Sequence, residues 1–269
     1  MMILIGLITG LALGLTGGGG SLLAVPMLVY LADMPMTTAV PVALIIVAGS
    51  ALVGTLEALK YRLLYLTPLM LFSIGAGLAT PVGIYIGNWF EDATRLLLFS
   101  ALAVVIAIRT VRNIWLRPDK PTLSNSQDPE HGPVCRFATP GWSFRFGSLC
   151  SAFLVGAGIM TGLASGFFGV GGGFLIVPAL MFLSQMSMRH AVANSLAIIT
   201  LMGLSSTVSS YAVLSETWQI WSPYLAMGAV GMLVGRIAAR HIPVAALQGT
   251  FGVVLFFTAI LTGYLTLIR

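Results

Sequence analysis

The chain has 269 residues, of which 58% are apolar and only 8% are charged, with 13 Lys and Arg against 8 Asp and Glu. Soluble globular chains carry about 25% charged residues, because a folded chain must cover its surface with polar groups. Long intervals without any charged residue include 1–32, 34–56, 63–90, 146–188, 217–235 and 241–268. Since a membrane helix needs about 20 apolar residues, the sequence predicts an all-α polytopic membrane protein and excludes a soluble domain.

The net charge of +5 does not indicate a nucleic-acid partner. The basic residues stand in short segments between apolar spans, as expected for loops that face the cytoplasm. The expected surroundings are therefore a lipid bilayer, with no nucleic acid bound. Cys135 and Cys150 give neither a metal-ligand spacing nor a disulfide framework, and no cofactor is expected.

The chain is a tandem repeat. Residues 6–46 align without a gap on residues 158–198, at an offset of 152, and 20 of these 41 pairs are identical. The identical pairs include six glycines and the Val-Pro pairs at Val25-Pro26 and Val177-Pro178. The sequence thus predicts a first repeat over 1–115, a polar cytoplasmic linker over 116–145 and a second repeat over 146–269.

Each half is predicted to contain four elements: one apolar segment broken by glycines, followed by three transmembrane helices. In the first half these are 2–32, broken at 17–21, then 39–56, 66–88 and 95–115. In the second half they are 146–185, broken at 169–173, then 190–214, 218–236 and 244–268. Consecutive glycines each cost about 1 kcal/mol in a helix relative to Ala, so the breaks are expected to interrupt the helices.

Two topologies are open, because each broken element either turns back as a re-entrant hairpin or crosses the bilayer. With hairpins the two halves are inverted, and 11 of the 13 basic residues fall on one side, leaving Arg95 and Arg269 opposite. With crossings the halves are parallel and the partition is 9 to 4. Because Lys and Arg concentrate in cytoplasmic loops, the inverted repeat is favoured over the parallel one.

The paired breaks predict a binding site for a small anion. Irregular backbone at membrane depth survives only where it is buried in protein or lines a polar cavity. Where each helix resumes, free N–H groups and the positive end of the helix dipole face the middle of the bilayer. An amide side chain inside the membrane is costly without a partner, so Asn194 and the adjacent Ser195 are added to the predicted site. The predicted substrate-binding residues are Gly18, Gly19, Gly20, Ser21, Gly171, Gly172, Gly173, Asn194 and Ser195.

Other glycines and charges have structural interpretations. Glycines at every fourth position allow close packing of membrane helices, which is the favoured role for Gly6, Gly10, Gly14, Gly158, Gly162 and Gly166. Glu57 stands three residues before Lys60, so an interfacial ion pair is favoured over a proton-coupling carboxylate.

The glycine run Gly17 to Gly20 followed by Val25-Pro26, and its repeat Gly169 to Gly173 followed by Val177-Pro178, resembles the sulfite exporter TauE/SafE family of permeases, as does Asn194-Ser195. The resemblance extends over nearly the whole chain. It implies secondary transport of a sulfur-containing or organic anion, such as sulfite or a sulfonate, across the bacterial inner membrane. Alternating access, coupling to a proton or cation and a homodimer are compatible with it.

Two other classes are weighed against an anion transporter. The first is a membrane enzyme, because Gly162-Leu163-Ala164-Ser165-Gly166 faintly resembles an intramembrane serine protease with His190 as base. The repeat carries Leu13 in place of Ser165, so an enzyme is not expected. The second is a passive anion channel or a non-transporting scaffold subunit, which flux measurements distinguish.

Overall fold

The computed structural model describes residues 2–116, 148–184, 186–239, 256 and 260. Within these ranges the chain forms ten helices and no strand. The first half contains α1 (Met2–Thr16), α2 (Gly20–Leu31), α3 (Met36–Lys60), α4 (Leu66–Gly87) and α5 (Asp92–Leu116). The second half contains α6 (Ser148–Phe168), α7 (Gly173–Ser184), α8 (Met188–Ser209), α9 (Tyr211–Glu216) and α10 (Trp218–Ala239).

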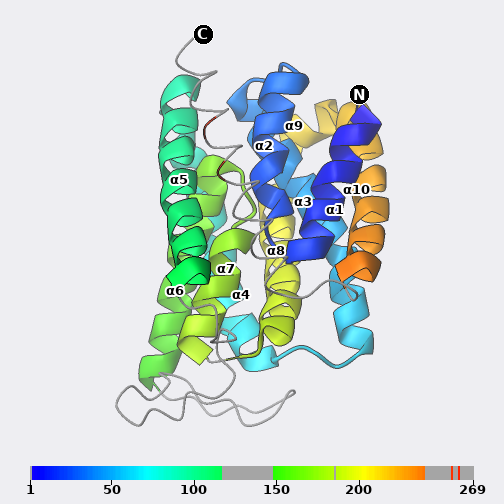
Figure 1. The fold of residues 1–269 in the computed structure, drawn as a ribbon. Helices are drawn as coiled ribbons and strands as arrows, with labels where there is room; N and C mark the ends of the chain where they lie inside the picture. The colour runs from blue at the N-terminus through cyan, green and yellow to red at the C-terminus, as the bar shows by residue number, and fades with distance from the viewer. Residues whose placement is uncertain (1, 117–147, 185, 240–255, 257–259, 261–269) are drawn as a thin grey trace.

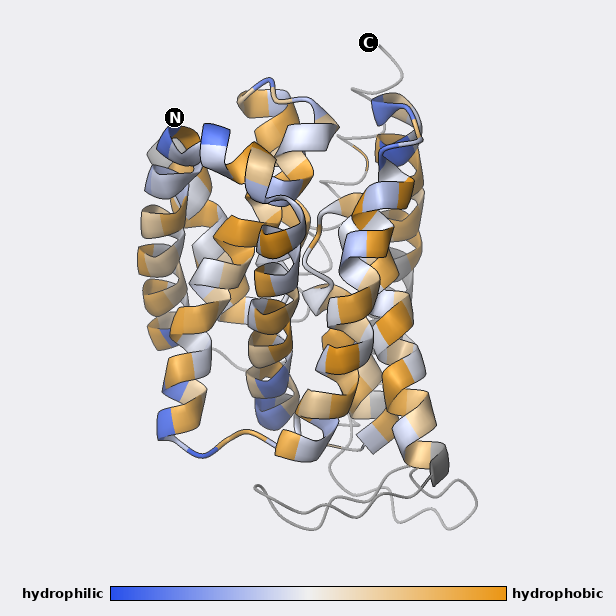
Figure 2. Ribbon diagram, turned by 180° about the vertical axis from the view of Figure 1, so that it is seen from behind, coloured by the Kyte–Doolittle hydropathy of each residue, from blue (hydrophilic) through white to orange (hydrophobic). Residues whose placement is uncertain are grey.

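The all-α membrane class is confirmed. Five helices of the described chain are long and apolar enough to span a bilayer: Met36–Lys60, Leu66–Gly87, Cys150–Phe168, Arg189–Ser209 and Trp218–Ala239. Apolar residues cover the middle of the bundle, whereas hydrophilic residues gather toward its two ends (Figure 2). This distribution suits a hydrocarbon layer around the middle.

The glycine breaks and the spans that follow them lie close to the predicted positions, with one difference. The predicted span 190–214 is two helices, because α8 ends at Ser209 and the short α9 begins at Tyr211. Cys150 is disulfide-bonded, a bond that the sequence analysis did not predict. The linker beyond residue 116 and most of the predicted span 244–268 lie outside the described residues, and the repeat boundaries stay predictions.

Helices of the two halves pack on each other in two equivalent pairs. Helix α1 packs along α10, with Gly6 against Tyr224, Gly10 against Gly228 and Gly14 against Met232 (Figure 1). Helix α4 packs along α6 in the same register, with Phe72, Ala76 and Thr80 against the glycines at 158, 162 and 166. Each of these glycines lies against backbone of the neighbouring helix, so the predicted packing role is confirmed.

Helices α3 and α8 form the centre of the bundle and run antiparallel. Gly203 of α8 lies against Ala48 of α3. Farther toward the end of α3, the hydroxyls of Thr55 and Thr200 are 3.2 Å apart. Later residues of α3 therefore contact earlier residues of α8. Most of α3 is buried. Because α3 and α8 occupy equivalent places in the two repeats, two equivalent helices run in opposite directions where the halves meet.

Candidate functional site

Each break begins at a glycine that ends the preceding helix. Gly17 and Gly169 both have φ of 73°, in the left-handed region that favours glycine. The N–H of Gly17 donates to Leu13 O at 2.7 Å, and that of Gly169 donates to Ser165 O at 2.7 Å. These bonds close the last turns of α1 and α6, so the two breaks start in the same way.

After each break the chain turns back along the helix it has just left. Gly20 lies against the carbonyl of Thr9 and against Leu13, and a Cβ atom placed on Gly172 would lie 3.5 Å from Thr161 O. In a continuous helix residues 11 apart would be separated by about 16 Å. The pairs α1–α2 and α6–α7 are therefore helical hairpins within the protein.

The two breaks touch. A Cβ atom placed on Gly173 would lie 2.6 Å from Gly18 Cα, and one on Gly171 would lie 3.4 Å from Ser21 Cβ. All four residues are buried. The predicted residues Gly18, Ser21, Gly171 and Gly173 are thus brought together, and only glycines allow backbones to approach so closely.

The remaining predicted glycines belong to the breaks but contact their own hairpins. Gly19 donates its N–H to Thr16 Oγ1 at 2.7 Å, and Gly20 packs on Leu13. Gly172 faces Ser165 and Met202. The hydroxyl of Ser21 donates to Gly18 O at 2.6 Å, which fixes that side chain against the first break.

Helices α3 and α8 each cover the break of the opposite half. Val192 on α8 lies against Gly17, and Val40 on α3, its counterpart in the repeat, lies against Gly169. Farther along, α8 also contacts the break of its own half, where Ile199 lies against Gly173. The stripe Val192, Ser195, Ile199 and Met202 follows helical spacing, so these residues share the face of α8 that contacts the breaks.

Ser195 lies between Val192 and Ile199 in the sequence, and helical spacing places it on the same face of α8. It is 0% exposed, and its hydroxyl has no hydrogen-bond partner among the described residues. A buried hydroxyl in a helix usually bonds a backbone carbonyl one turn away, as Ser50 does to Ile46 O at 2.8 Å. The free hydroxyl of Ser195 is therefore available to a ligand.

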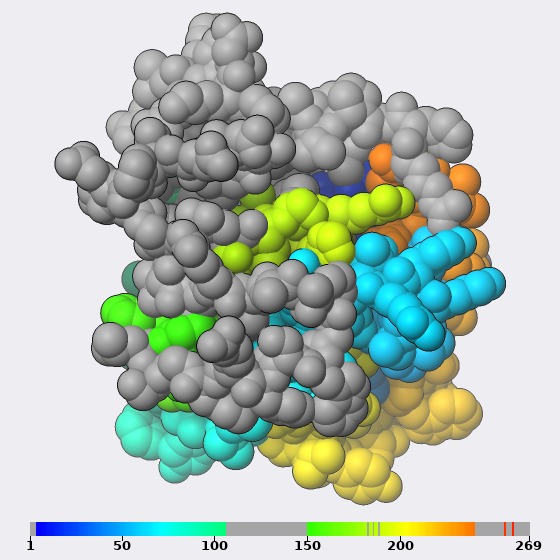
Figure 3. All heavy atoms as spheres, turned by 90° about the horizontal axis from the view of Figure 1, so that it is seen from below, coloured from blue at the N-terminus to red at the C-terminus, as the bar shows by residue number. Residues whose placement is uncertain are grey.

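Asn194 stands on a different face of α8, about 200° around the helix from Val192. Its Oδ1 accepts a hydrogen bond from Tyr65 N at 3.2 Å, and its Nδ2 donates to His190 O at 2.8 Å. Asn194 therefore joins the start of α8 to the α3–α4 connection. Figure 3 shows this end of the molecule, where the cyan α3–α4 region lies beside yellow-green atoms of the second half.

The electrostatics of the breaks favour an anion. Helices α2 and α7 both begin at the breaks, with no acidic residue in either first turn. The N–H groups of a first turn lack partners within the helix, and the dipole adds partial positive charge there. Together with Ser195, this region offers several hydrogen-bond donors and no carboxylate from the two helix starts.

Two buried polar residues near the second break were not predicted as site residues. Ser165 is 1% exposed with an unpartnered hydroxyl, and its Cβ lies 3.5 Å from a Cβ atom placed on Gly172. Arg95 was expected at the start of the span 95–115, on the side opposite most other basic residues; it lies in the first turn of α5 and is 0% exposed. Two features of the sequence could have indicated these residues. Ser165 departs from the repeat, which has Leu13 at the equivalent position, and Arg95 is one of two basic residues that the inverted topology leaves on the opposite side of the membrane.

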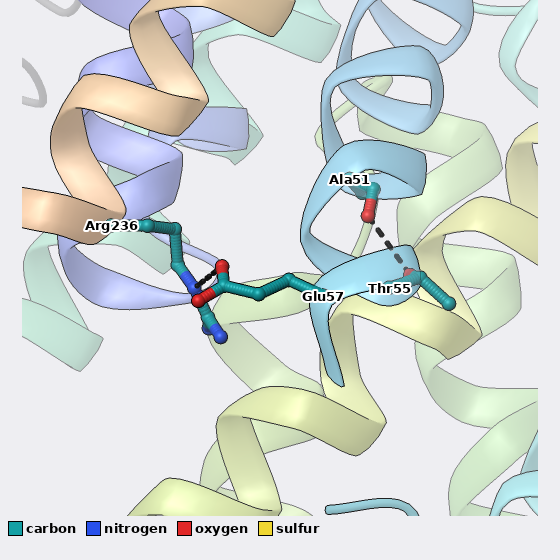
Figure 4. A network of polar contacts seen from close by, with 4 residues as sticks. All are labelled: Ala51, Thr55, Glu57 and Arg236. Carbon is teal, nitrogen blue, oxygen red and sulfur yellow. Dashed lines mark hydrogen bonds and ion pairs between the residues drawn. The ribbon is translucent and has the colours of Figure 1, made fainter. Parts of the chain in front are cut away.

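Glu57 forms an ion pair between the two halves. Its Oε2 lies 2.9 Å from Nε of Arg236 on α10 (Figure 4), with the two side chains 20% and 16% exposed. Lys60 was the favoured partner, but the described contact is with Arg236. The sequence concealed this pair because 179 residues separate its members.

The residues considered for a serine protease do not form a catalytic pair. Ser165 lies beside Gly172, which also faces Met202 of α8. His190 is 12 residues from Met202, about 18 Å along the helix, and its Nδ1 is 2.8 Å from Ser187 Oγ. This separation gives no support to nucleophilic catalysis.

Known proteins resemble the chain along nearly its whole length. The profile of the family described as Sulfite exporter TauE/SafE matches residues 2–262. A probable membrane transporter protein of Xylella fastidiosa is 29% identical over 256 residues, covering 94% of this chain and 90% of the relative. The probable membrane transporter protein YunE of Bacillus subtilis is 28% identical over 220 residues, covering 78% and 77%. No solved structure matches significantly. The chain belongs to the sulfite exporter TauE/SafE family, whose matched relatives are described as membrane transporters.

Proposed function

We propose that this protein is a secondary transporter of a small sulfur-containing or organic oxyanion, with sulfite and sulfonates as the first candidates. The family description and the bacterial origin of the relatives support this substrate class and a bacterial inner-membrane location. The proposed contacts are backbone amides where the two breaks meet and the hydroxyl of Ser195.

One observation carries the proposal: the two breaks contact each other at Gly18 and Gly173. Two interrupted helices from the two halves of a repeat commonly hold the substrate of an inverted-repeat transporter where they meet. Helical spacing places Ser195 on the face of α8 that contacts the breaks, and its buried hydroxyl has no partner among the described residues. A small oxyanion accepts several hydrogen bonds at once, so it matches a group of amide and hydroxyl donors.

We further propose that the halves have opposite orientations in the membrane and that both broken elements are re-entrant. The antiparallel α3 and α8 support the inverted arrangement, and the folded-back hairpins support re-entry. Helices α2 and α7 have 12 residues each, about 18 Å, so their starts would lie near the midplane of a hydrocarbon layer of about 30 Å. Alternating access would rock one set of helices against the other around the breaks.

The experiment is flux of radiolabelled sulfite into proteoliposomes, with and without a pH gradient. A coupled transporter should accumulate sulfite when the gradient is applied and should also exchange labelled for unlabelled sulfite without it. Voltage-driven flux without any accumulation would favour a passive anion channel. Absence of flux for sulfite, methanesulfonate and acetate would favour a non-transporting scaffold. Proton coupling and a homodimer are expectations that the same preparation tests.

A further inference from the structure

The two breaks are alike in backbone but differ in the polar groups beside them. At an offset of 152, Ser165 of the second half corresponds to Leu13 of the first, and Ser195 corresponds to Ala43. Leu13 packs on Gly20 just as Ser165 packs beside Gly172. At these two positions the second half has buried hydroxyls where the first has apolar side chains. The buried hydroxyl of the first break, that of Ser21, is already bonded to Gly18 O.

The hydroxyl of Ser165 has no partner although its own helix offers one. Thr161, one turn earlier on α6, donates to Ala157 O at 2.8 Å and to Gly158 O at 3.0 Å. The corresponding carbonyl for Ser165 is that of Thr161, which lies beside Gly172. A buried hydroxyl that leaves such a bond unmade lowers the stability of the protein unless another acceptor completes it.

A buried cation also stands beside the second break. Arg95 donates from Nε and Nη2 to Phe167 O at 3.2 and 2.6 Å, two residues before the break begins, and its Nη1 has no partner among the described residues. Asp92, three residues earlier on α5, interacts electrostatically with Arg95, but none of the described carboxylates lies within 4.0 Å of its guanidinium. One turn farther along α5, Phe99 packs in a cluster with Val170 and Phe174 of the second break. The counterpart of Arg95 in the repeat is Leu247, which carries no charge.

We propose that the two breaks have different roles: the second break binds the oxyanion, with Ser165 as a side-chain donor, and the first break supplies close backbone packing. This inference rests on the proposed function and adds the residue that makes the site asymmetric. The amides at Gly171, Gly172 and Gly173 and the Ser165 hydroxyl donate to the anion. The charge of Arg95 favours a negative ligand on this side of the bundle.

An oxyanion suits this site because its oxygens accept hydrogen bonds without needing a proton from the protein. Hydrogen bonds to a charged partner are stronger than those between neutral groups. Loss of one such bond from a buried site should weaken binding by about 10- to 100-fold. A halide, which makes less directional contacts, should lose less affinity than sulfite.

The test compares Ser165→Ala with Ser50→Ala in the full chain, purified into lipid nanodiscs. Both serines are buried, but Ser50 bonds its own helix at 2.8 Å. Sulfite and methanesulfonate binding are measured by calorimetry, and the melting temperature is measured without ligand. We expect Ser165→Ala to bind at least 10-fold more weakly while melting at the same or a higher temperature, because an unmade hydrogen bond is removed. Ser50→Ala should bind within about twofold of the unchanged protein.

The outcomes separate the two proposals. If the unchanged protein binds sulfite and Ser165→Ala binds it equally well, the asymmetric site is wrong and the transport function stands. A Ser165→Ala protein that melts at a clearly lower temperature with unchanged affinity would assign the hydroxyl a purely structural role and would also overturn the inference. If the unchanged protein binds neither anion, both the inference and the proposed function fail.

Discussion

Gly18 of the first half and Gly173 of the second half lie in direct backbone contact, with a Cβ atom on Gly173 only 2.6 Å from Gly18 Cα. Any side chain at either position would have to separate the two breaks. Because the two residues come from different halves, their contact changes whenever one half moves against the other. The alternating access proposed above would therefore act on this contact.

Two glycines of α6 allow the close-packing role to be tested, because one lies against a neighbouring helix and the other does not. Gly158 lies against Phe72 O of α4, whereas a Cβ atom on Gly156 meets nothing within 4 Å. We expect Gly158→Ala to lower the melting temperature, since the helices must move apart. Gly156→Ala should leave it equal or higher because Ala favours the helix. Equal losses at both positions would contradict the close-packing interpretation.

The ion pair between Glu57 and Arg236 should stabilise the arrangement in which α3 and α10 are held together. Replacing Glu57 by Gln leaves Arg236 without its described charge partner and should cost about 1 kcal/mol, a modest value because both side chains are partly exposed. The measurement is chemical unfolding of Glu57→Gln, Arg236→Gln and the double variant. The double variant should be more stable than the sum of the single losses predicts. Strict additivity would show that the pair does not contribute.

Ser195 and Asn194 are adjacent in sequence but should differ in their effects. Asn194→Ala removes bonds to Tyr65 N and His190 O and should lower the free energy of unfolding by about 1–3 kcal/mol, with little change in the sulfite concentration for half-maximal uptake. Ser195→Ala should raise that concentration with little loss of stability. Uptake and unfolding measured on the same preparations check both. The reverse pattern would place Asn194, and not Ser195, in the anion site.

The buried guanidinium of Arg95 should act through its charge as well as through its bonds to Phe167 O. Arg95→Lys retains the positive charge and loses the paired donors, whereas Arg95→Gln loses the charge. We expect the Lys variant to retain more sulfite affinity than the Gln variant. Calorimetric binding on folded protein, verified by its melting transition, provides the comparison. Equal affinity in both variants would show that the charge has no part in binding.

The sequence predicted the helices well because their signals are local. Charge-free intervals set the spans, and glycines at 17 and 169 ended helices where the prediction placed them. Helices at equivalent places of the two halves pack in the same register, α1 on α10 and α6 on α4. The end of α8 at Ser209 was missed, since the polar residues from Ser205 onward remain compatible with a longer helix.

The candidate site was predictable only in part, because contacts across the repeat leave no local pattern. The glycines of the breaks were recognised from their composition, and Ser195 from its position beside Asn194. Which of those two side chains faces the breaks depends on the rotation of α8, which its neighbours set. Arg95 and Arg236 acquired their partners through packing between halves, which no spacing in one segment could indicate.

Anion binding at the breaks is tested most directly by locating a heavy oxyanion bound to the protein. Selenite has the shape and charge of sulfite, and selenium gives an anomalous scattering signal in a crystal of the full chain. We expect a selenium peak beside the amides of Gly171, Gly172 and Gly173, next to the contact between Gly18 and Gly173. A peak confined to the ends of the bundle, with the breaks unoccupied at saturating selenite, would contradict it.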